Sequence, residues 1–259
     1  MSSFLIPEKT IYISSALKII MVSGIIEWLT NNYGEYEQRE KWDRIADQWY
    51  EFRHYPLPEV KEFALFIGKQ PVPPWPLKKN VLDIGAGAGR NLLPFKNHHL
   101  FALDFSGEML KQVKRYSKKF DLDTTIIEGS ATALPLKDDF FDVVLCIATL
   151  HCVETKKERL ECLKEMKRVM RPGAFALISV WNRWQWRFFP RNIFLSDVYV
   201  PWHRRKEHIK RFYHLFSYGE LENLVKKAGL EVIKTYPELK YSGIKNFSEN
   251  IFAVVKKPL

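Results

Sequence analysis

The chain has 259 residues and a mass of 30.6 kDa, which is enough for one large domain or two small ones. Hydrophobic residues make up 46% of it and aromatic residues 14%, a composition that excludes an intrinsically disordered chain. The cysteines Cys146, Cys152 and Cys162 have no paired spacing, which excludes a disulfide framework and a four-ligand zinc site. The formal net charge of +10 favours an anionic partner.

The first 39 residues are predicted to form an amphipathic helical extension. Residues 11–29 are apolar but include Lys18 and Glu27, and two charges are costly within a membrane span. The segment has no basic start and no small-residue cleavage site, so no signal peptide is expected. We therefore expect a cytoplasmic protein, with a membrane anchor as the alternative.

From residue 40 onward the chain predicts one domain, 40–259. Residues 40–67 predict a helix that breaks near Pro56 and Pro58, and a proline-rich connector follows at 70–76. Further helices are expected at 90–96, 106–120, 156–170 and 217–229, and strands at 81–84, 100–103, 124–127, 143–148, 175–180, 230–236 and 250–256. This alternation is typical of a doubly wound α/β fold with a seven-stranded, mostly parallel sheet and an antiparallel edge strand.

Residues 181–216 stand out as a basic aromatic insertion. They hold eight Lys/Arg against two Asp/Glu, whereas residues 1–80 hold ten of each. The aromatic residues among these cations are Trp181, Trp184, Trp186, Phe188, Phe189, Trp202, Phe212, Tyr213 and Phe216. Such interleaving favours an interface for unpaired RNA, because cations meet phosphates and flat rings meet bases. The alternative is a basic flap whose aromatic residues pack onto the core.

The first predicted strand ends in a glycine-rich turn. Asp83 is followed by Gly85, Ala86 and Gly87, and the glycines have the spacing G-x-G-x-G. Small residues let a ligand approach the backbone closely, and ligands bind at this end of such sheets. The carboxylate repels a pyrophosphate and attracts a cofactor with a cationic amino acid end. A nicotinamide dehydrogenase is therefore disfavoured.

The second predicted strand ends at Asp104, whose carboxylate can accept both hydroxyl groups of an adenosine ribose. The alternative is that Asp104 caps the helix that follows. Phe105 is expected to stack beside the adenine, and the loop with Ser130 and Ala131 suits the adenine edge. The other residues assigned to this cofactor site are Asn91 and Ile147.

Taken in order, these motifs resemble the class I S-adenosylmethionine-dependent methyltransferases, over roughly residues 40–257. The resemblance implies a Rossmann-like fold and S-adenosyl-L-methionine as the cofactor. It implies that Asp83, Gly85 and Gly87 line the methionine end. It also implies that Asp104 holds the ribose.

Segments outside the cofactor motifs resemble the tRNA wobble-uridine methyltransferases, which esterify a carboxymethyl group on uridine 34. These segments are RIA at 44–46, FRHYPLP at 52–58, ATLH at 148–151, VW at 180–181 and RFYHLF at 211–216. The resemblance implies a tRNA anticodon loop as partner. It also implies a small zinc-binding activator protein, which would hold the zinc, so no metal is expected in this chain.

A carboxylate acceptor is already ionised at pH 7, so the reaction needs alignment rather than a strong base. We assign Arg53 to hold the acceptor carboxylate and His151 to position the acceptor, as catalytic residues. The alternatives are an ion pair of Arg53 with a neighbouring glutamate and a rim position for His151. The residues expected to contact RNA are Arg53, His151, Arg183, Arg187, Arg211, Tyr213 and His214.

Two other functions remain open from the sequence. A methyltransferase for a small molecule, such as a quinone or lipid precursor, would keep the cofactor residues and make no use of the basic aromatic insertion. A non-catalytic RNA-binding protein would keep only the fold. Cys152 as the nucleophile of a C5-pyrimidine methylase is disfavoured, because the expected proline–cysteine context is absent.

Overall fold

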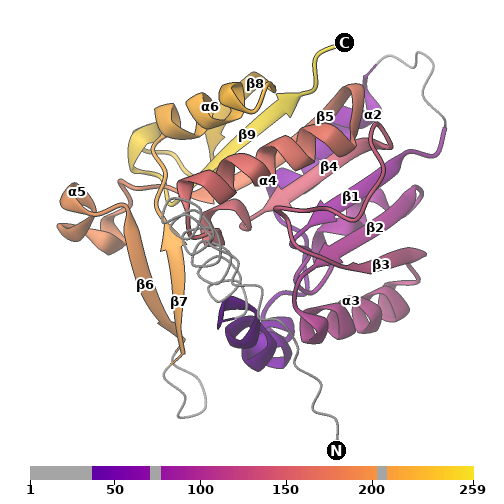
Figure 1. Cartoon of the computed structure of the whole chain (residues 1–259), viewed down its shortest axis with the longest axis horizontal. Coiled ribbons are helices and arrows are strands. Elements are labelled where there is room, and N and C mark those ends of the chain that lie inside the picture. Colours follow the sequence, from indigo (N-terminus) through magenta and orange to yellow (C-terminus); the bar gives the residue numbers. More distant parts are fainter. Residues whose placement is uncertain (1–36, 71–76, 203–208) are drawn as a thin grey trace, which may run out of the picture. The chain divides into compact units, whose positions relative to one another are not determined.

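Seven strands form one mostly parallel sheet in the order β3-β2-β1-β4-β5-β9-β8 (Figure 1). Their bounds are β1 (Asn80–Ile84), β2 (His99–Asp104), β3 (Thr124–Glu128), β4 (Phe141–Ile147), β5 (Met170–Trp181), β8 (Glu231–Pro237) and β9 (Asn250–Lys256). Strands β1 to β5 run parallel, and β9 pairs antiparallel with both β5 and β8. The predicted doubly wound fold with an antiparallel edge is confirmed.

The structure is a computed structural model that describes residues 37–70, 77–202 and 209–259. Residues 38–259 form one compact unit. The predicted N-terminal extension lies outside the described residues except for residues 37–39, and the proline-rich connector does so except for Gln70. Among the helices that are described, none combines the length and apolar character needed to cross a membrane.

Side chains cap the N-termini of three of the described helices, which start after Ser106, Thr155 and Ser217. Ser106 Oγ accepts from Met109 N at 3.1 Å, and Thr155 forms a reciprocal capping box with Glu158. The helical segments are residues 38–51, α2 (Pro58–Gly68), α3 (Gly107–Phe120), α4 (Lys156–Val169), α5 (Arg191–Phe194), α6 (Tyr218–Lys227) and the short 3-10 turns η1 (Arg90–Phe95), η2 (Leu150–Cys152), η3 (Trp186–Phe188) and η4 (Lys245–Phe247).

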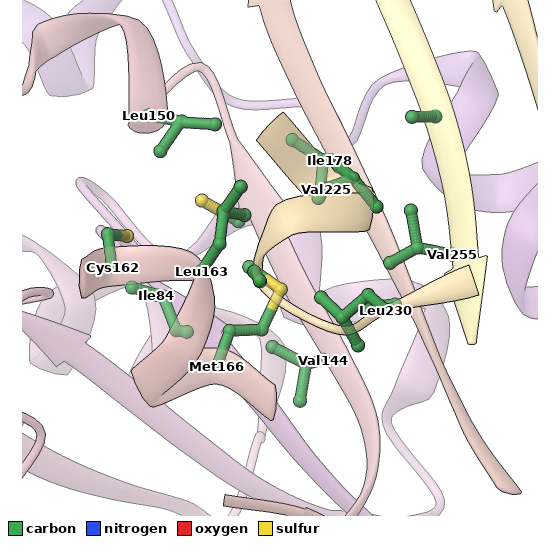
Figure 2. Close-up of a cluster of buried hydrophobic side chains, with 14 of the residues drawn as sticks. Ile84, Val144, Leu150, Cys162, Leu163, Met166, Ile178, Val225, Leu230 and Val255 are labelled. Carbon is green, nitrogen blue, oxygen red and sulfur yellow. The ribbon is translucent and has the colours of Figure 1, made fainter. Parts of the chain in front are cut away.

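Two apolar clusters cover the two faces of the sheet. One joins alternate strand residues to α4 and α6, and Figure 2 shows Leu163 and Met166 of α4 with Val225 of α6 and Val144 of β4. The other packs the opposite face against α2, η1 and α3. All seven residues of β4 are buried, as expected for a parallel strand covered on both sides. This core fixes the positions of the strand ends.

Several boundaries differ from the prediction. The expected helix at 90–96 is the 3-10 turn η1, because Pro94 lies inside it and cannot donate to an α-helical bond. Helix α4 ends at Val169, and β5 starts at Met170 rather than at residue 175.

A second sheet was not predicted. Within the basic aromatic insertion, β6 (Asp197–Trp202) and β7 (Ile209–His214) pair antiparallel. Pro201 in β6 and the adjacent Lys210 and Arg211 in β7 interrupt the sequence pattern that would have indicated strands.

Candidate active site

Backbone hydrogen bonds hold the glycine-rich turn against β2. Gly85 N and Ala86 N donate to Leu103 O at 2.8 and 2.9 Å. Gly85 has a φ of 69°, in the left-handed region that glycine tolerates. A Cβ on Gly85 would also lie 2.3 Å from Thr149 Oγ1, so the close approach of Thr149 requires glycine here.

Asp83 lies next to the last residue of β1 and is fully buried. Neither carboxyl oxygen has a hydrogen-bond donor among the described residues. Burial, followed by the charge of Asp104, raises the pKa of Asp83 to about 8, and Arg90 offsets only part of this. A buried polar group without a donor is costly, and a cationic ligand would relieve that cost.

The Asp104 carboxylate lies beside the same turn. Its Oδ2 accepts from Gly87 N at 2.8 Å and its Oδ1 from Ser106 N at 3.0 Å. Burial raises the pKa of Asp104 to about 6 in spite of these donors. Ser106 is the residue that caps α3, so the alternative that Asp104 is the helix cap is wrong.

The structure brings the other residues predicted for the cofactor to the same edge of the sheet. They are buried (Ala86, Asn91 and Ile147) or partly exposed (Phe105, Ser130 and Ala131). The loop after β3 is joined to β2 by a bond from Gly129 N to Asp104 O at 3.1 Å. The end of β4 is joined to the glycine turn by Thr149 Oγ1, which lies 3.3 Å from Gly85 O. The four strand ends therefore surround one site.

Trp49 covers this site, and the sequence analysis did not identify it. Its Nε1 lies 3.3 Å from where a Cβ on Gly87 would be. The guanidinium of Arg53 stacks 3.7 Å from its ring centroid. The ring of Trp42 packs edge-on against that of Trp49 with centroids 5.1 Å apart, and the ring of Trp202 of β6 lies 5.9 Å away at a tilt of 42°. The spacing of Trp42 and Trp49, two helical turns apart, was the only available signal.

Side-chain hydrogen bonds fix the helix of residues 38–51 in this position. Ser106 Oγ donates to Asp43 Oδ1 at 2.5 Å, which connects the helix to α3. Trp202 Nε1 donates to Gln48 Oε1 at 2.8 Å, which connects it to β6. The helix thus joins the cofactor side of the site to the β6–β7 hairpin.

His151 lies in η2, directly after β4, and is 1% exposed. Its Nδ1 accepts from Trp181 N at 2.9 Å, so the neutral ring carries its proton on Nε2. Burial and the charges of Arg211, His214 and Arg53 lower the pKa of His151 to about 3. His151 is therefore a neutral hydrogen-bond donor at physiological pH.

Arg53 and Arg211 form the cationic part of the site. Arg211 is 6% exposed, and the rings of Trp42, Trp49, Trp202 and Tyr213 surround its guanidinium at 4.8 to 5.9 Å. Its Nε has no hydrogen-bond partner among the described residues. Burial lowers the pKa of Arg53 to about 10, and Arg90 and Arg211 act in the same direction. Within the described residues, no acidic side chain pairs with Arg53 or Arg211.

Of three more residues predicted for RNA contact, Tyr213 and Arg187 lie near Arg211. Tyr213 is buried and its ring stacks on Trp181 at 4.2 Å. Arg187 is exposed, with its guanidinium 5.4 Å from the same Trp181 ring. Arg183 donates to Ile193 O at 3.0 Å. Trp181, which was predicted as an aromatic residue of the insertion and as part of the VW segment but given no site role, contacts both Tyr213 and Arg187.

His214 has a different environment. It is 5% exposed, and its two ring nitrogens lie 2.5 Å from Asp197 Oδ1 and 2.9 Å from Glu220 Oε1. These contacts connect the β6–β7 hairpin to α6. Its role in RNA contact stays a prediction.

Neither the Cys152 thiol nor the arrangement of possible metal ligands among the described residues indicates nucleophilic or metal-dependent catalysis. Partial burial raises the pKa of Cys152 to about 12, so its nucleophilic thiolate form is scarce at neutral pH. The described residues hold no group of three or more His, Cys, Asp or Glu side chains that could bind a metal ion. The site therefore combines buried carboxyl groups with unpaired arginines.

Comparison with known proteins identifies the family. The family model described as a methyltransferase domain matches residues 82–178. A protein of Encephalitozoon cuniculi whose name assigns it to the methyltransferases is 30% identical over 182 residues, which cover 68% of this chain and 78% of the relative. The chain belongs to the class I S-adenosylmethionine-dependent methyltransferases.

Other relatives of this methyltransferase carry more specific names. A Schizosaccharomyces pombe protein named tRNA (carboxymethyluridine(34)-5-O)-methyltransferase is 29% identical over 227 residues, covering 77% of this chain and 92% of the relative. A Mus musculus protein named as a tRNA methyltransferase 9B is 31% identical over 124 residues, but this chain matches only 26% of its length.

Solved structures share the fold. The CcbJ methyltransferase of Streptomyces caelestis superimposes with a TM-score of 0.66 at 17% identity, covering 85% of this chain and 98% of that one. A chain from the complex of the Haloferax volcanii Trm112 methyltransferase activator with a methyltransferase gives a TM-score of 0.56 at 19% identity, covering 84% and 98%.

S-adenosylmethionine is the cofactor of this methyltransferase, and the residues present fit it. Asp83 supplies a buried carboxyl group that lacks a protein donor, as a cationic ammonium group requires. Asp104 supplies carboxylate oxygens at the next strand end, where hydroxyl groups would be accepted.

Proposed function

We propose that this methyltransferase transfers a methyl group to the carboxylate of 5-carboxymethyluridine at the wobble position of tRNA. The observation that carries the proposal is the pair of buried or half-buried arginines, Arg53 and Arg211, which have no acidic partner among the described residues. Unpaired buried cations favour an anionic ligand, and a guanidinium matches a carboxylate in shape and charge.

In this proposal the cofactor lies across the ends of β1 to β4. Asp83 binds the ammonium group, and Gly85 and Gly87 allow close approach of the methionine end. Asp104 accepts the ribose hydroxyl groups, while Ser130 and Ala131 border the adenine. Ala86, Asn91, Phe105 and Ile147 complete the pocket. When bound, S-adenosylmethionine supplies a methyl group on a sulfonium sulfur.

The residues on the acceptor side orient the substrate carboxylate. One carboxylate oxygen forms the new bond to the methyl carbon as the bond from that carbon to sulfur breaks, so no proton moves. Arg53 and Arg211 hold the carboxylate, and Nε2 of His151 donates a hydrogen bond that fixes the acceptor. The rings of Trp49, Trp181 and Tyr213 exclude water, which strengthens these charge interactions.

The tRNA assignment is supported by the composition of the insertion and by the name of the fission yeast relative. The arginines predicted to meet the anticodon loop, Arg183 and Arg187, lie on the segment that leads from Trp181 at the acceptor side. His214 and Tyr213 support the hairpin that carries Arg211. The same assignment implies a cytoplasmic enzyme.

An activator subunit would bind the edge of the sheet in this proposal. Strand β3 lies at one edge of the sheet, where β2 is its one partner among the described strands, and Ile126 on it is 36% exposed. An edge strand offers unpaired backbone groups to a partner strand. The match to a chain solved with a Trm112 activator supports such a partner.

The test is nucleoside mass spectrometry on tRNA that carries 5-carboxymethyluridine, after incubation with the full chain and isotopically labelled S-adenosylmethionine. The reaction should be run with and without a zinc-binding activator. Label in the methyl ester of the wobble uridine is expected. Label in another nucleoside would refute the acceptor assignment, and no label with cofactor binding confirmed would favour a small-molecule acceptor.

A further inference from the structure

A group of aromatic side chains is exposed outside the acceptor pocket. Trp186 of η3 is 71% exposed, Phe189 57% and Phe247 of η4 40%. Trp186 stacks on Phe247 with ring centroids 5.9 Å apart and an interplanar angle of 18°, and it contacts Phe189 at 5.7 Å. We call these three side chains the stacking platform. Large exposed aromatic patches mark interaction sites rather than packing.

The stacking platform is continuous with the candidate active site. Phe188 follows within the same 3-10 turn as Trp186, and it lies 5.9 Å from Trp181. Trp181 in turn stacks on Tyr213, and its backbone N–H donates to His151. A row of rings therefore leads from the acceptor pocket to the exposed platform.

The charge around the stacking platform selects among partners. Residues 181–196 contain three arginines, Arg183, Arg187 and Arg191, and no Asp or Glu. The guanidinium of Arg187 lies 5.4 Å from the Phe188 ring, and that of Arg183 lies 5.3 Å from the Trp184 ring. Flat rings alternating with cations match the bases and phosphates of a single strand, whereas a purely apolar partner would gain nothing from three cations.

We infer that the stacking platform binds unpaired RNA bases that flank the nucleotide held in the acceptor pocket. This inference rests on the proposed function and deepens it. Bases stack on Trp186 and Phe247, while Arg187 and Arg191 contact phosphates. The platform selects single-stranded RNA because the base faces in a duplex are already stacked.

The test measures RNA affinity with the full chain, a fluorescently labelled single-stranded RNA and fluorescence anisotropy. We expect Trp186→Ala to weaken binding about tenfold, the loss typical of removing one stacked base contact. The matched control is Leu65→Ala on α2, which removes an equally exposed apolar side chain, 60% exposed, far along the chain from the insertion. It should bind RNA as the unaltered chain does.

Salt dependence separates stacking from charge. Arg187→Gln should lower the slope of affinity against salt by about one, whereas Trp186→Ala should weaken binding without changing that slope. Binding of duplex RNA should be the same for Trp186→Ala and the unaltered chain. Three results would overturn the inference. Trp186→Ala could lose as much affinity for duplex RNA as for single-stranded RNA, or it could bind single-stranded RNA as tightly as Leu65→Ala does. The third is that the unaltered chain binds no RNA.

Methyl transfer to the free 5-carboxymethyluridine nucleoside distinguishes failure of this inference from failure of the proposed function. Trp186→Ala should methylate the nucleoside as the unaltered chain does, because the platform lies outside the pocket. If the unaltered chain methylates the nucleoside but Trp186→Ala binds RNA as tightly as the unaltered chain does, the proposed function stands and the inference about the stacking platform is wrong. If binding of lipid vesicles or of a protein partner depended on Trp186 and RNA binding did not, the platform would serve another partner and the inference would be wrong.

Discussion

The two halves of the candidate active site differ in the sign of their buried charge. On the cofactor half, Asp83 and Asp104 are buried carboxyl groups whose pKa values are raised by that burial. On the acceptor half, Arg53 and Arg211 are guanidinium groups whose pKa values are lowered by burial. Among the described residues, Asp83 has no hydrogen-bond donor, Arg211 Nε has no acceptor, and no acidic side chain pairs with either arginine.

This difference indicates what each half binds. A group that is buried at a cost and left unpaired is ready for a ligand of the opposite charge. The cofactor half therefore suits the cationic amino acid end of S-adenosylmethionine, and the acceptor half suits an anion. Aromatic side chains separate the two halves, and Trp49 contacts both, since it lies beside Gly87 and under Arg53.

The largest expected effect is on the cofactor half. Asp104→Ala should reduce cofactor affinity at least a hundredfold, because two charge-assisted hydrogen bonds of about 1.5–3 kcal/mol each are lost. Isothermal titration calorimetry measures this loss. Asp104→Asn is the control that keeps an acceptor oxygen and should lose less. Unchanged affinity for Asp104→Ala would remove Asp104 from the ribose role.

The matching change on the acceptor half should leave cofactor binding intact. Arg53→Ala should keep cofactor affinity within about twofold while kcat/KM for carboxymethyluridine falls about a hundredfold, as when one member of a buried charge pair is removed. Arg53→Lys should recover only part of the activity, because an ammonium lacks the paired donors of a guanidinium. If cofactor affinity and turnover fell equally, Arg53 would instead contribute to the cofactor pocket or to the stability of the fold.

The raised pKa of Asp83 predicts opposite pH trends for stability and for cofactor binding. Its ordinary pKa of 3.8 rises to about 8, so the folded chain holds a proton that the unfolded chain releases between these values. Stability should therefore fall as pH rises through this window. Cofactor affinity should rise by about tenfold per pH unit below pH 8, because the ammonium group requires the ionised carboxylate.

Thermal unfolding and calorimetry from pH 7 to pH 8 measure the two trends above the pKa of about 6 of Asp104, so that its titration does not contribute. Asp83→Asn is the control, since it keeps the shape of the side chain and cannot ionise. It should abolish the pH dependence of cofactor affinity. A pH dependence that persists in Asp83→Asn would assign the titration to another group.

The smallest expected effect concerns His151. Because its pKa is lowered to about 3, it stays neutral from pH 5 to pH 8 and should give no ionisation in kcat near pH 6.5. The pH profile of kcat is measured at saturating cofactor, so that Asp83 does not contribute. A step near pH 6.5 that disappears in His151→Gln would show that His151 titrates during turnover.

The succession of strands and helices along the chain and the cofactor motifs could be predicted, because both depend on residues that are neighbours in sequence. Asp104 ends the apolar run of residues 100–103, and Asp83 lies within the apolar segment of residues 81–84, directly before the glycine turn. The helices expected at 106–120 and 217–229 are also found, with Ser106 and Ser217 as their N-caps, and Glu220 Oε1 lies 2.9 Å from His214 Nε2. At residues 90–96 the local signal against an α-helix was Pro94, and the structure has a 3-10 turn there instead of the expected helix.

The sequence by itself determined the fold class, the family and the residues that line the strand ends, since hydrophobic periodicity and short motifs specify these locally. Only the tertiary structure determines which residues come together in the acceptor half of the site. Trp49, Trp202 and Arg211 come together through contacts such as that of Gln48 with Trp202, 154 residues apart in the chain. Arg211 becomes buried among these rings, without an acidic partner among the described residues, only when the hairpin packs against the helix of residues 38–51.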